Sequence, residues 1–226
     1  MAFLPTMPNE EFKVFVYEQF SKIGKSFSSP QRLIIMNILC QGEHTVETIA
    51  RYSKMSIANV SRHLQILKSA NLVKVRRDGK FIFYSPADEE TCTFFNSFQK
   101  FAIRQITEIK HALEEISAYP SRLEPVQWSE LVNMMKEKNT IIIDVRPHEE
   151  YKSGHIPGSI SIPLEDLEQR VKEIPKANKV VAYCRGRFCI LADKAVEILI
   201  EKGYDAVRAE DGLVDWKIAG FPVEYS

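Results

Sequence analysis

The 226-residue sequence lacks the features that mark exported and membrane proteins. No early stretch combines a basic start, an apolar run and a small-residue cleavage site, and no apolar run approaches the length that spans a bilayer. Only four cysteines occur, at irregular positions, so we expect reduced thiols rather than a disulfide framework. The formal net charge is zero, and the sequence shows neither internal repeats nor low-complexity segments. We therefore expect a cytoplasmic globular protein without membrane contact, made of one large domain or two modest ones.

Two prolines, Pro120 and Pro125, bracket a short polar stretch between two differently patterned regions. Upstream, apolar residues recur at helical spacing over 9–24, 30–41, 45–52, 56–70 and 87–118. Downstream, β-branched runs occur at 141–143, 180–181 and 206–208. Helical patterns separate these runs, near 128–138, 165–173 and 190–202. We therefore predict a mainly α domain over 1–119, a linker over 120–125, and an α/β domain with a mostly parallel sheet over 126–226.

The helix predicted over 87–118 carries more apolar side chains than one side of a small domain needs. They include Phe94, Phe95, Phe98, Phe101, Ile106, Ile109 and Leu113. This excess favours a homodimer that forms through this helix together with the first one. A simple core helix is the alternative.

Basic side chains are concentrated in residues 44–86, where Glu47 and Asp78 are the only acidic ones. The basic residues are Arg51, Lys54, Arg62, Lys68, Lys74, Arg76, Arg77 and Lys80. Such a local excess of positive charge predicts a surface that faces phosphates.

One helix of this basic segment has the residue types that contact DNA. Its apolar residues recur at three- and four-residue steps, which places them on one face: Ile57, Val60, Leu64 and Leu67. The other faces carry side chains that hydrogen-bond base edges or phosphates: Ser56, Asn59, Ser61, Arg62, His63 and Gln65. We predict that this helix enters the major groove of double-stranded DNA.

A hairpin is predicted after this helix. Asn71 tolerates the left-handed conformation that ends helices, and Arg77-Asp78-Gly79 between two apolar runs suits a tight turn. The tip would then carry three basic side chains near the DNA backbone: Arg76, Arg77 and Lys80. Helix and hairpin together form a winged helix-turn-helix. The alternative is a protein-interaction module built from the same elements.

The string Val60-Ser61-Arg62-His63-Leu64, with Leu67, Leu72-Val73, Arg77, Gly79 and Tyr84, resembles the ArsR/SmtB family of bacterial repressors. The resemblance covers roughly residues 10–115 and implies a homodimer that leaves its operator when an effector binds. In this family the effector is often a thiophilic metal, but residues 44–52 lack the cysteines of the family's thiolate cluster. His111 with Glu114 or Glu115 also lacks the partners for the ligand set on the last helix. We expect no metal and no other cofactor.

Some relatives in that family sense reactive sulfur through two cysteines, one near the end of the second helix and one on the last. Cys40 matches the first location, and Cys92 lies nearer the start of the last helix than the usual partner does. The two residues are candidate sensor thiols. The alternative is that both are small buried apolar residues.

Cys184 ends an apolar strand and opens a loop, Cys184-Arg185-Gly186-Arg187-Phe188-Cys189, that leads into a helical pattern. Such a turn points backbone N–H groups and a helix N-terminus at the sulfur, so we expect the pKa of Cys184 to lie below its ordinary value. In parallel sheets, ligands bind at the carboxyl ends of the strands, which is where Cys184 lies. We predict that Cys184 is a nucleophile for sulfur chemistry.

Four segments around Cys184 resemble the rhodanese domain, and the resemblance covers residues 122–226. In order they are Asp144 to Tyr151, Gly154 to Ile160, Gly212 to Trp216, and Gly220 to Val223. The resemblance implies that Cys184 takes the sulfane sulfur of a donor such as thiosulfate, polysulfide or a persulfide and passes it to a thiol or cyanide acceptor. We assign four charged or titratable residues to the scaffold rather than to catalysis: Asp144, Arg146, Glu150 and His155. Trp216 is expected to pack the closing segment.

The predicted substrate-binding loop consists of Arg185, Gly186, Arg187 and Phe188. Its arginines bind an anionic donor, or lower the thiol pKa, or are solvated. Cys189 stands where many rhodaneses have a basic or small residue, which disfavours thiosulfate turnover more than persulfide formation. It either resolves a persulfide in a disulfide with Cys184, or packs at the start of the helix.

Together these patterns predict a dimeric transcriptional regulator whose Cys184 persulfide, or a Cys184–Cys189 product, changes its affinity for DNA. The alternative is a thiosulfate or persulfide sulfurtransferase whose winged helix serves for dimerisation or DNA tethering. An enzyme turns over many times, whereas a sensor reacts once. A third option, an inert ligand-binding module, is disfavoured because Cys184 is present.

Overall fold

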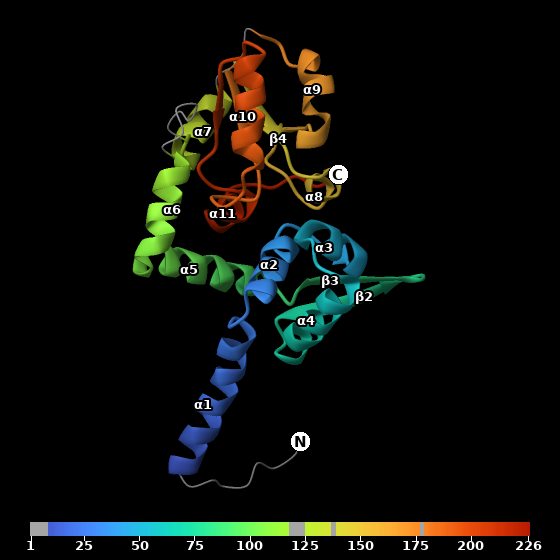
Figure 1. Cartoon of the computed structure of the whole chain (residues 1–226), viewed down its shortest axis with the longest axis vertical. Coiled ribbons are helices and arrows are strands. Elements are labelled where there is room, and N and C mark those ends of the chain that lie inside the picture. Colours follow the sequence, from blue (N-terminus) through green and yellow to red (C-terminus); the bar gives the residue numbers. More distant parts are fainter. Residues whose placement is uncertain (1–8, 118–124, 137–138, 177–178) are drawn as a thin grey trace. The chain divides into compact units, whose positions relative to one another are not determined.

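The computed structural model describes residues 9–117, 125–136, 139–176 and 179–226. The chain forms two compact units, Met1–Thr91 and Cys92–Ser226 (Figure 1). Of the predicted linker, 120–124 lies outside the described residues. The compact units divide earlier in the chain, inside a helix that begins at Glu89. The predicted domain limits 1–119 and 126–226 stay predictions.

The first unit consists of helices and a small antiparallel sheet. Its helices are α1 (Asn9–Ser26), α2 (Pro30–Leu39), α3 (Val46–Ser53) and α4 (Ile57–Ser69). Its strands are β1 (His44–Thr45), β2 (Val73–Asp78) and β3 (Phe81–Pro86), in the order β1-β3-β2. The helices predicted upstream of residue 87 and both strands of the hairpin are confirmed. Helices α2, α3 and α4 bury apolar residues, whereas Ser26 is the only buried residue of α1.

Helix α4 buries the face that its apolar spacing predicts, with one exception. Val60, Leu64 and Leu67 are fully buried, whereas Ile57 is 53% exposed. Ile57 is the first residue of the helix. Asn71 follows the helix at a φ of 57°, the left-handed conformation that was predicted for it.

The second unit begins within helix α5 (Glu89–Gln105) and continues with α6 (Thr107–Ser117). The single helix predicted over 87–118 is therefore wrong, since Ile106 separates two helices. Ile106 and Thr107 are consecutive β-branched residues, which lose side-chain freedom in a helix and lower its propensity.

The remaining elements of the second unit form an α/β fold. Its helices are α7 (Trp128–Lys136), α8 (His148–Lys152), α9 (Leu167–Arg170), α10 (Leu191–Glu201) and α11 (Leu213–Ile218). Its strands are β4 (Thr140–Asp144), β5 (Ile160–Ser161), β6 (Lys179–Tyr183) and β7 (Ala206–Arg208). Two short 3-10 turns, η1 (Leu164–Asp166) and η2 (Val171–Glu173), flank α9.

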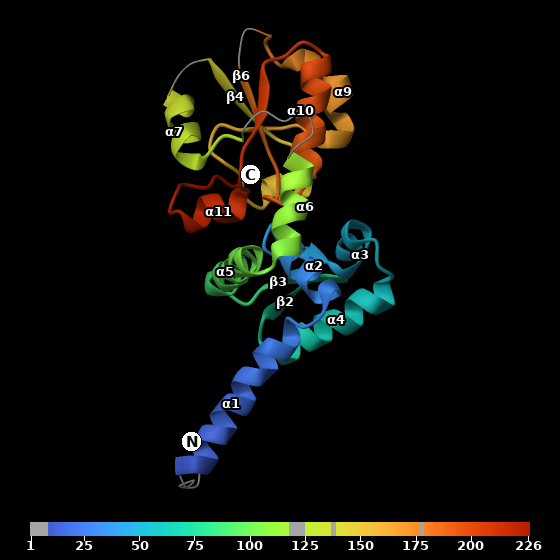
Figure 2. The same cartoon turned by 60° about the vertical axis from the view of Figure 1, so that its left-hand side comes forward.

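The sheet of the second unit is parallel, in the order β5-β4-β6-β7, which confirms the predicted parallel sheet. Helices α9 and α10 pack on one face and α7 and α11 on the other (Figure 2). Along β6, Val180 and Ala182 face the first layer, and Val181 and Tyr183 face the second. Both faces of the strand are buried, which explains its continuous apolar run. Among the helices in the described ranges, none is both long and apolar enough to cross a membrane.

Candidate functional site

Cys184 directly follows β6, one of the two middle strands of the parallel sheet, at its carboxyl end. The residue is 3% exposed and packs with the core layer of α10. Its Sγ atom donates to the backbone oxygen of Cys189 at 3.3 Å. The backbone N–H groups of Gly186 and Ala192 donate to the same sulfur. The predicted cradle of amides at a strand-to-helix turn is thus present.

The two thiols of the loop interact, and this interaction overturns the predicted pKa of Cys184. Burial, followed by the side chain of Cys189, raises the pKa of Cys184 well above its ordinary value. A hydrogen bond from Cys184, together with the N–H groups of Arg185 and Leu191 and the Arg185 charge, lowers the pKa of Cys189 to about 6. The sequence argument counted the amides but neither the depth of burial nor the neighbouring thiol. Burial therefore favours the protonated form of Cys184, and its neighbours favour the thiolate form of Cys189.

Both arginines of the loop are held by carboxylates. The Nε atom of Arg185 donates to the two oxygens of Glu150 at 3.1 and 3.0 Å, and Glu150 is fully buried. Arg187 Nε donates to Asp211 at 2.6 Å, and its guanidinium also pairs with Glu210 at 2.9 Å. Arg185 is thus held inside the fold, whereas Arg187 is 38% exposed as well as paired, and the choice between donor binding and solvation stays open. Phe188, in contrast, is 51% exposed beside the thiols.

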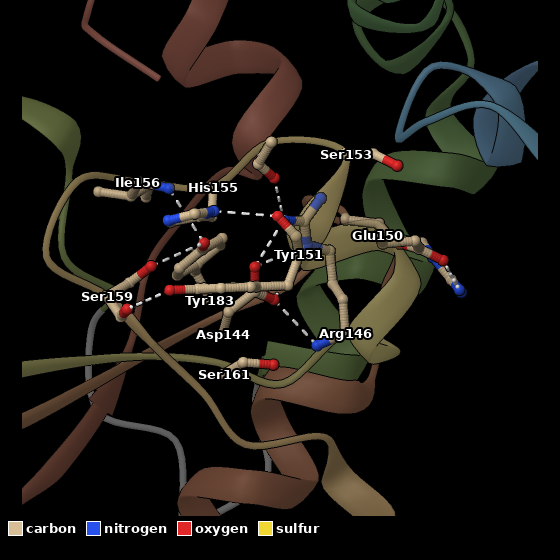
Figure 3. A network of polar contacts seen from close by, with 12 residues as sticks. Asp144, Arg146, Glu150, Tyr151, Ser153, His155, Ile156, Ser159, Ser161 and Tyr183 are labelled. Carbon is tan, nitrogen blue, oxygen red and sulfur yellow. Dashed lines mark hydrogen bonds and ion pairs between the residues drawn. The ribbon is translucent and has the colours of Figure 1, made fainter. Parts of the chain in front are cut away.

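A buried polar network supports the loop from the side of α8 (Figure 3). Arg146 binds Asp144 through Nε at 2.9 and 3.0 Å and donates to the Gly154 oxygen at 2.8 Å. His155 contacts the Tyr151 oxygen at 3.0 Å and stacks on that ring at 3.7 Å. These charged groups pair with neighbours inside the fold, as the scaffold assignment predicted.

Two glycines allow the loop to pack against the segment that precedes α11. Gly186 has a φ of +121°, which side chains rarely adopt. A Cβ on Gly212 would lie 2.4 Å from the carbonyl carbon of Arg185 and 2.5 Å from the nitrogen of Gly186. No role of Gly212 was predicted, because its contact with the loop joins residues far apart in the sequence. Trp216 closes this segment, since its Nε1 donates to the Pro222 oxygen at 2.7 Å.

Helix α4 presents most of its predicted DNA-contacting residues on its surface. Asn59, Arg62 and Gln65 are exposed, and Ser61 is half-buried. Ser56 accepts a hydrogen bond from Asn59 N at 3.3 Å and so caps the helix. Its hydroxyl thus has a structural partner as well as its predicted role toward DNA.

His63 is half-buried on the same helix. Burial, followed by the charges of Arg32 and Arg62, lowers its pKa below the ordinary value. Its Nδ1 atom has no hydrogen-bond partner among the described residues. Its surroundings therefore favour the neutral imidazole, which packs partly inward.

The three predicted basic residues of the β2–β3 hairpin differ in whether they pair with carboxylates of the protein. Arg77 and Lys80 are exposed at the turn. Arg76 binds Glu43 at 2.7 Å and Asp78 at 3.0 Å, and its guanidinium lies 4.7 Å from the ring centre of Phe83. The charge of Arg76 is therefore already compensated within the protein.

Sequence comparison matches a segment in each half of the chain to a protein family. The family described as "Bacterial regulatory protein, arsR family" matches residues 29–75, and the family described as "Rhodanese-like domain" matches residues 127–219. An HTH-type transcriptional regulator of Mycobacterium tuberculosis is 36% identical over 212 residues, which cover 94% of this chain and 93% of that protein. The chain belongs to the ArsR family. In this ArsR-type regulator a rhodanese-like domain follows the DNA-binding winged helix-turn-helix.

Each half also has similar proteins of its own. The thiosulfate sulfurtransferase PspE of Escherichia coli is 41% identical over 76 residues, covering 32% of the ArsR-type chain and 70% of that enzyme. The homodimeric winged helix-turn-helix domain of a possible ArsR-family regulator from Mycobacterium bovis is 33% identical. Its solution structure has a TM-score of 0.41 and covers 47% of this chain and 94% of that one.

The cysteines of this ArsR-type regulator are in two states. Cys184 and Cys189 are free, whereas Cys40 and Cys92 are disulfide-bonded. The expectation of four reduced thiols is therefore wrong, because sequence spacing does not reveal which thiols find a partner. The sensor role of Cys40 and Cys92 stays a prediction. Within the described ranges, no three His, Cys, Asp or Glu side chains are grouped to hold a metal ion.

Proposed function

We propose that this ArsR-type regulator is a cytoplasmic sensor of reactive sulfur, in which sulfane sulfur bound to Cys184 changes the affinity of a homodimer for its operator. The closeness of the two loop cysteines carries the proposal. Cys184 Sγ donates to the backbone oxygen of Cys189 at 3.3 Å, and the two thiols shift each other's pKa in opposite directions. A thiol pair of this kind can take up a sulfur atom and then report it as a disulfide.

The uptake step needs a base close to Cys184, and Cys189 meets that need. The Cys189 thiolate takes the proton of Cys184 while the Cys184 sulfur attacks the outer sulfur of a persulfide donor, R–S–SH. The S–S bond of the donor breaks, R–S⁻ leaves with the bonding electrons, and Cys184–S–SH forms. The amides of Gly186 and Ala192 stabilise the negative charge that develops on sulfur.

A second step closes the pair without an external oxidant. Cys189 releases its proton to solvent and attacks the inner sulfur of Cys184–S–SH. The Cys184–Cys189 disulfide forms and HS⁻ leaves with the electrons of the broken S–S bond. Reduction by a cellular thiol would restore the starting state.

Dimerisation is supported by the exposed apolar side chains of α1. Phe12, Phe15 and Phe20 follow helical spacing, and these side chains are 53%, 39% and 64% exposed. Such a row on one helix is typical of an interface. Phe94 and Phe101 of α5, one heptad apart, are 50% and 54% exposed and add apolar surface of the same kind.

The test is a binding titration of a fluorescent promoter fragment at fixed salt, with reduced and with polysulfide-treated protein. A coupling of about 2 kcal/mol between the two states gives a roughly thirtyfold difference in affinity. Mass spectrometry follows the addition of one sulfur atom to Cys184. We expect Cys184→Ser to bind DNA as the reduced protein does and to lose the response, and a full response in that variant contradicts the proposal.

The second candidate is a sulfurtransferase that uses the winged helix for dimerisation or to stay on DNA. It is favoured by the 41% identity of the rhodanese half to an enzyme named thiosulfate sulfurtransferase. Turnover with thiosulfate and a thiol acceptor separates the two candidates. A sensor transfers about one sulfur per chain, whereas sustained turnover with unchanged DNA affinity identifies the enzyme.

A further inference from the structure

We propose that Asp215 couples the Cys184 loop to helix α5. Formation of a persulfide or disulfide at Cys184 would thereby affect the wing, which is the hairpin of β2 and β3. The inference rests on the proposed sulfur-sensing function and names the residues that transmit the signal. Asp215 lies in the first turn of the six-residue helix α11 and touches structure on both sides.

On one side, the Asp215 carboxylate binds α5 through two side chains one helical turn apart. Asn96 Nδ2 donates to Asp215 Oδ1 at 2.8 Å, and Lys100 Nζ pairs with the same oxygen at 2.8 Å. The Asp215 side chain is 12% exposed and Asn96 is 8% exposed. A mostly buried carboxylate that loses its partners is unfavourable, because its charge is left uncompensated. When Asp215 moves, α5 is therefore expected to move with it.

On the other side, α11 begins against the loop. The Cβ position of Gly212 lies within 2.6 Å of three backbone atoms of Arg185 and Gly186, so the two backbones are in direct contact. Asp215 Oδ2 lies 3.7 Å from the Cβ position of Gly186. Because not even one further carbon atom fits at Gly212, a displaced loop must push the start of α11.

Ion pairs form a second connection between the Cys184 loop and the segment before α11. Arg187 of the loop binds Asp211 at 2.6 Å and Glu210 at 2.9 Å, the two residues directly before Gly212. Asp215 also contributes to the raised pKa of Arg187. Loop and α11 therefore move as one body.

The sulfur chemistry itself supplies the displacement. Cys184 is 3% exposed, so the sulfur added in Cys184–S–SH, or the bond to Cys189, meets atoms of the loop rather than solvent. The loop has to rearrange to hold either product. Since Gly212 leaves no space behind the loop, Asp215 shifts with it and changes its bonds to Asn96 and Lys100.

Helix α5 is continuous in the chain with the wing. Strand β3 ends at Pro86 and α5 begins at Glu89. Ala87 and Asp88 are the only residues between them, and the Asp88 carboxylate caps α5 by accepting from Thr91 N and from the Thr91 hydroxyl at 2.8 and 2.7 Å. A change at Asp215 thus enters a helix whose first turn is tied to the strand of the DNA-contacting hairpin.

The test compares Lys100→Glu with two matched variants of the full chain. Lys100→Glu places a carboxylate opposite Asp215, and because Lys100 is 48% exposed the protein is expected to fold. Lys100→Arg keeps the ion pair, and Arg104→Glu makes the same charge change at an exposed position one turn further along α5. For each protein, DNA affinity is measured before and after polysulfide treatment, together with the mass of Cys184.

We expect the roughly thirtyfold affinity ratio of the wild type to fall below about threefold in Lys100→Glu while Cys184 still gains its sulfur. The Lys100→Arg and Arg104→Glu variants should keep the wild-type ratio. A full ratio in Lys100→Glu overturns the coupling.

Hydrogen exchange separates failure of the coupling from failure of the proposed function. Backbone amides of residues 93–104 should change their exchange on persulfidation in the wild type and not in Lys100→Glu. If they change while DNA affinity does not, the sensor function fails and the coupling stands. If the amides of α5 do not respond in persulfidated wild type, the coupling fails.

Discussion

The loop after β6 places two thiols in a shared hydrogen-bonded environment, and their properties are set by the pair. Burial keeps the proton on Cys184, while backbone amides and the charge of Arg185 favour the thiolate of Cys189. Cys184 is then a buried nucleophile, and Cys189, which favours the thiolate form, can act as its base. This arrangement explains how a cysteine with a raised pKa can still react at neutral pH.

The pair predicts a titration near pH 6. Absorbance at 240 nm should report one thiolate with a midpoint at about 6 in the wild type, and this step should be absent in Cys189→Ser. Because the folded-state pKa of Cys189 is depressed, its ionisation stabilises the fold above the ordinary thiol pKa, and that stability is lost as pH falls toward 6. Chemical unfolding at pH 6 and pH 8 measures this difference. A midpoint that stays in Cys189→Ser contradicts the assignment.

Gly212 is predicted to hold the loop in its reactive shape. Gly212→Ala adds a Cβ at 2.4 Å from Arg185, so the loop backbone must shift. We expect a loss of about 1–3 kcal/mol in the free energy of unfolding, as is typical of overpacking, and at least tenfold slower persulfidation of Cys184. Gly24→Ala is the control for substituting a glycine, since nothing lies within 4 Å of its Cβ position and its φ is not positive. Normal kinetics in Gly212→Ala argue against this role.

At the scale of elements, the winged helix separates residues that are predicted to contact DNA from residues that hold the fold. Helix α4 buries Val60, Leu64 and Leu67 and exposes Asn59, Arg62 and Gln65. In the hairpin, Arg77 and Lys80 are exposed, whereas Arg76 is engaged by Glu43 and Asp78. The three basic residues of the wing should therefore differ in their effect on DNA binding.

The wing predicts a graded response to alanine substitution. Arg77→Ala and Lys80→Ala should each weaken binding to all DNA sequences and reduce the slope of log affinity against log salt by about 0.9. Arg76→Ala should change the slope less, because its charge is compensated by two carboxylates. Anisotropy titrations at several salt concentrations measure the slopes. An equal loss for all three variants disagrees with the pairing of Arg76.

At the scale of the whole molecule, the proposed dimer combines sulfur chemistry with operator binding. Two recognition helices bind two half-sites only when the two chains are held together. Helix α1, with Phe12, Phe15 and Phe20 exposed, is the element that supports such pairing most directly. Dimerisation and DNA affinity should then be lost together.

A single charge in this apolar row tests the dimer. Phe20 is 64% exposed, so Phe20→Glu should leave the fold of the chain intact and shift sedimentation from dimer to monomer. DNA affinity should fall at least tenfold, since one recognition helix has to bind alone. Lys22→Glu, the same new charge on an exposed position of α1, is the control. A monomeric wild type refutes this part of the proposal.

The sequence by itself determined the elements whose signal is periodic. The apolar steps of α4, the β-branched runs of β4, β6 and β7, and the turn at Gly79 follow from local preference and burial. The place of Cys184 at the end of a strand was likewise predictable, because a parallel sheet puts reactive loops at that edge. These features depend on residues close together in the chain.

Only the tertiary structure decided which groups meet across the fold. The proton shared by Cys184 and Cys189, the capture of Arg185 by buried Glu150, and the contact of Gly212 with the loop all depend on packing depth and on partners distant in sequence. A pKa reflects desolvation as much as nearby dipoles, and desolvation is a property of the folded core. For that reason the residue types of the site were predictable, whereas their protonation and the coupling through Asp215 were not.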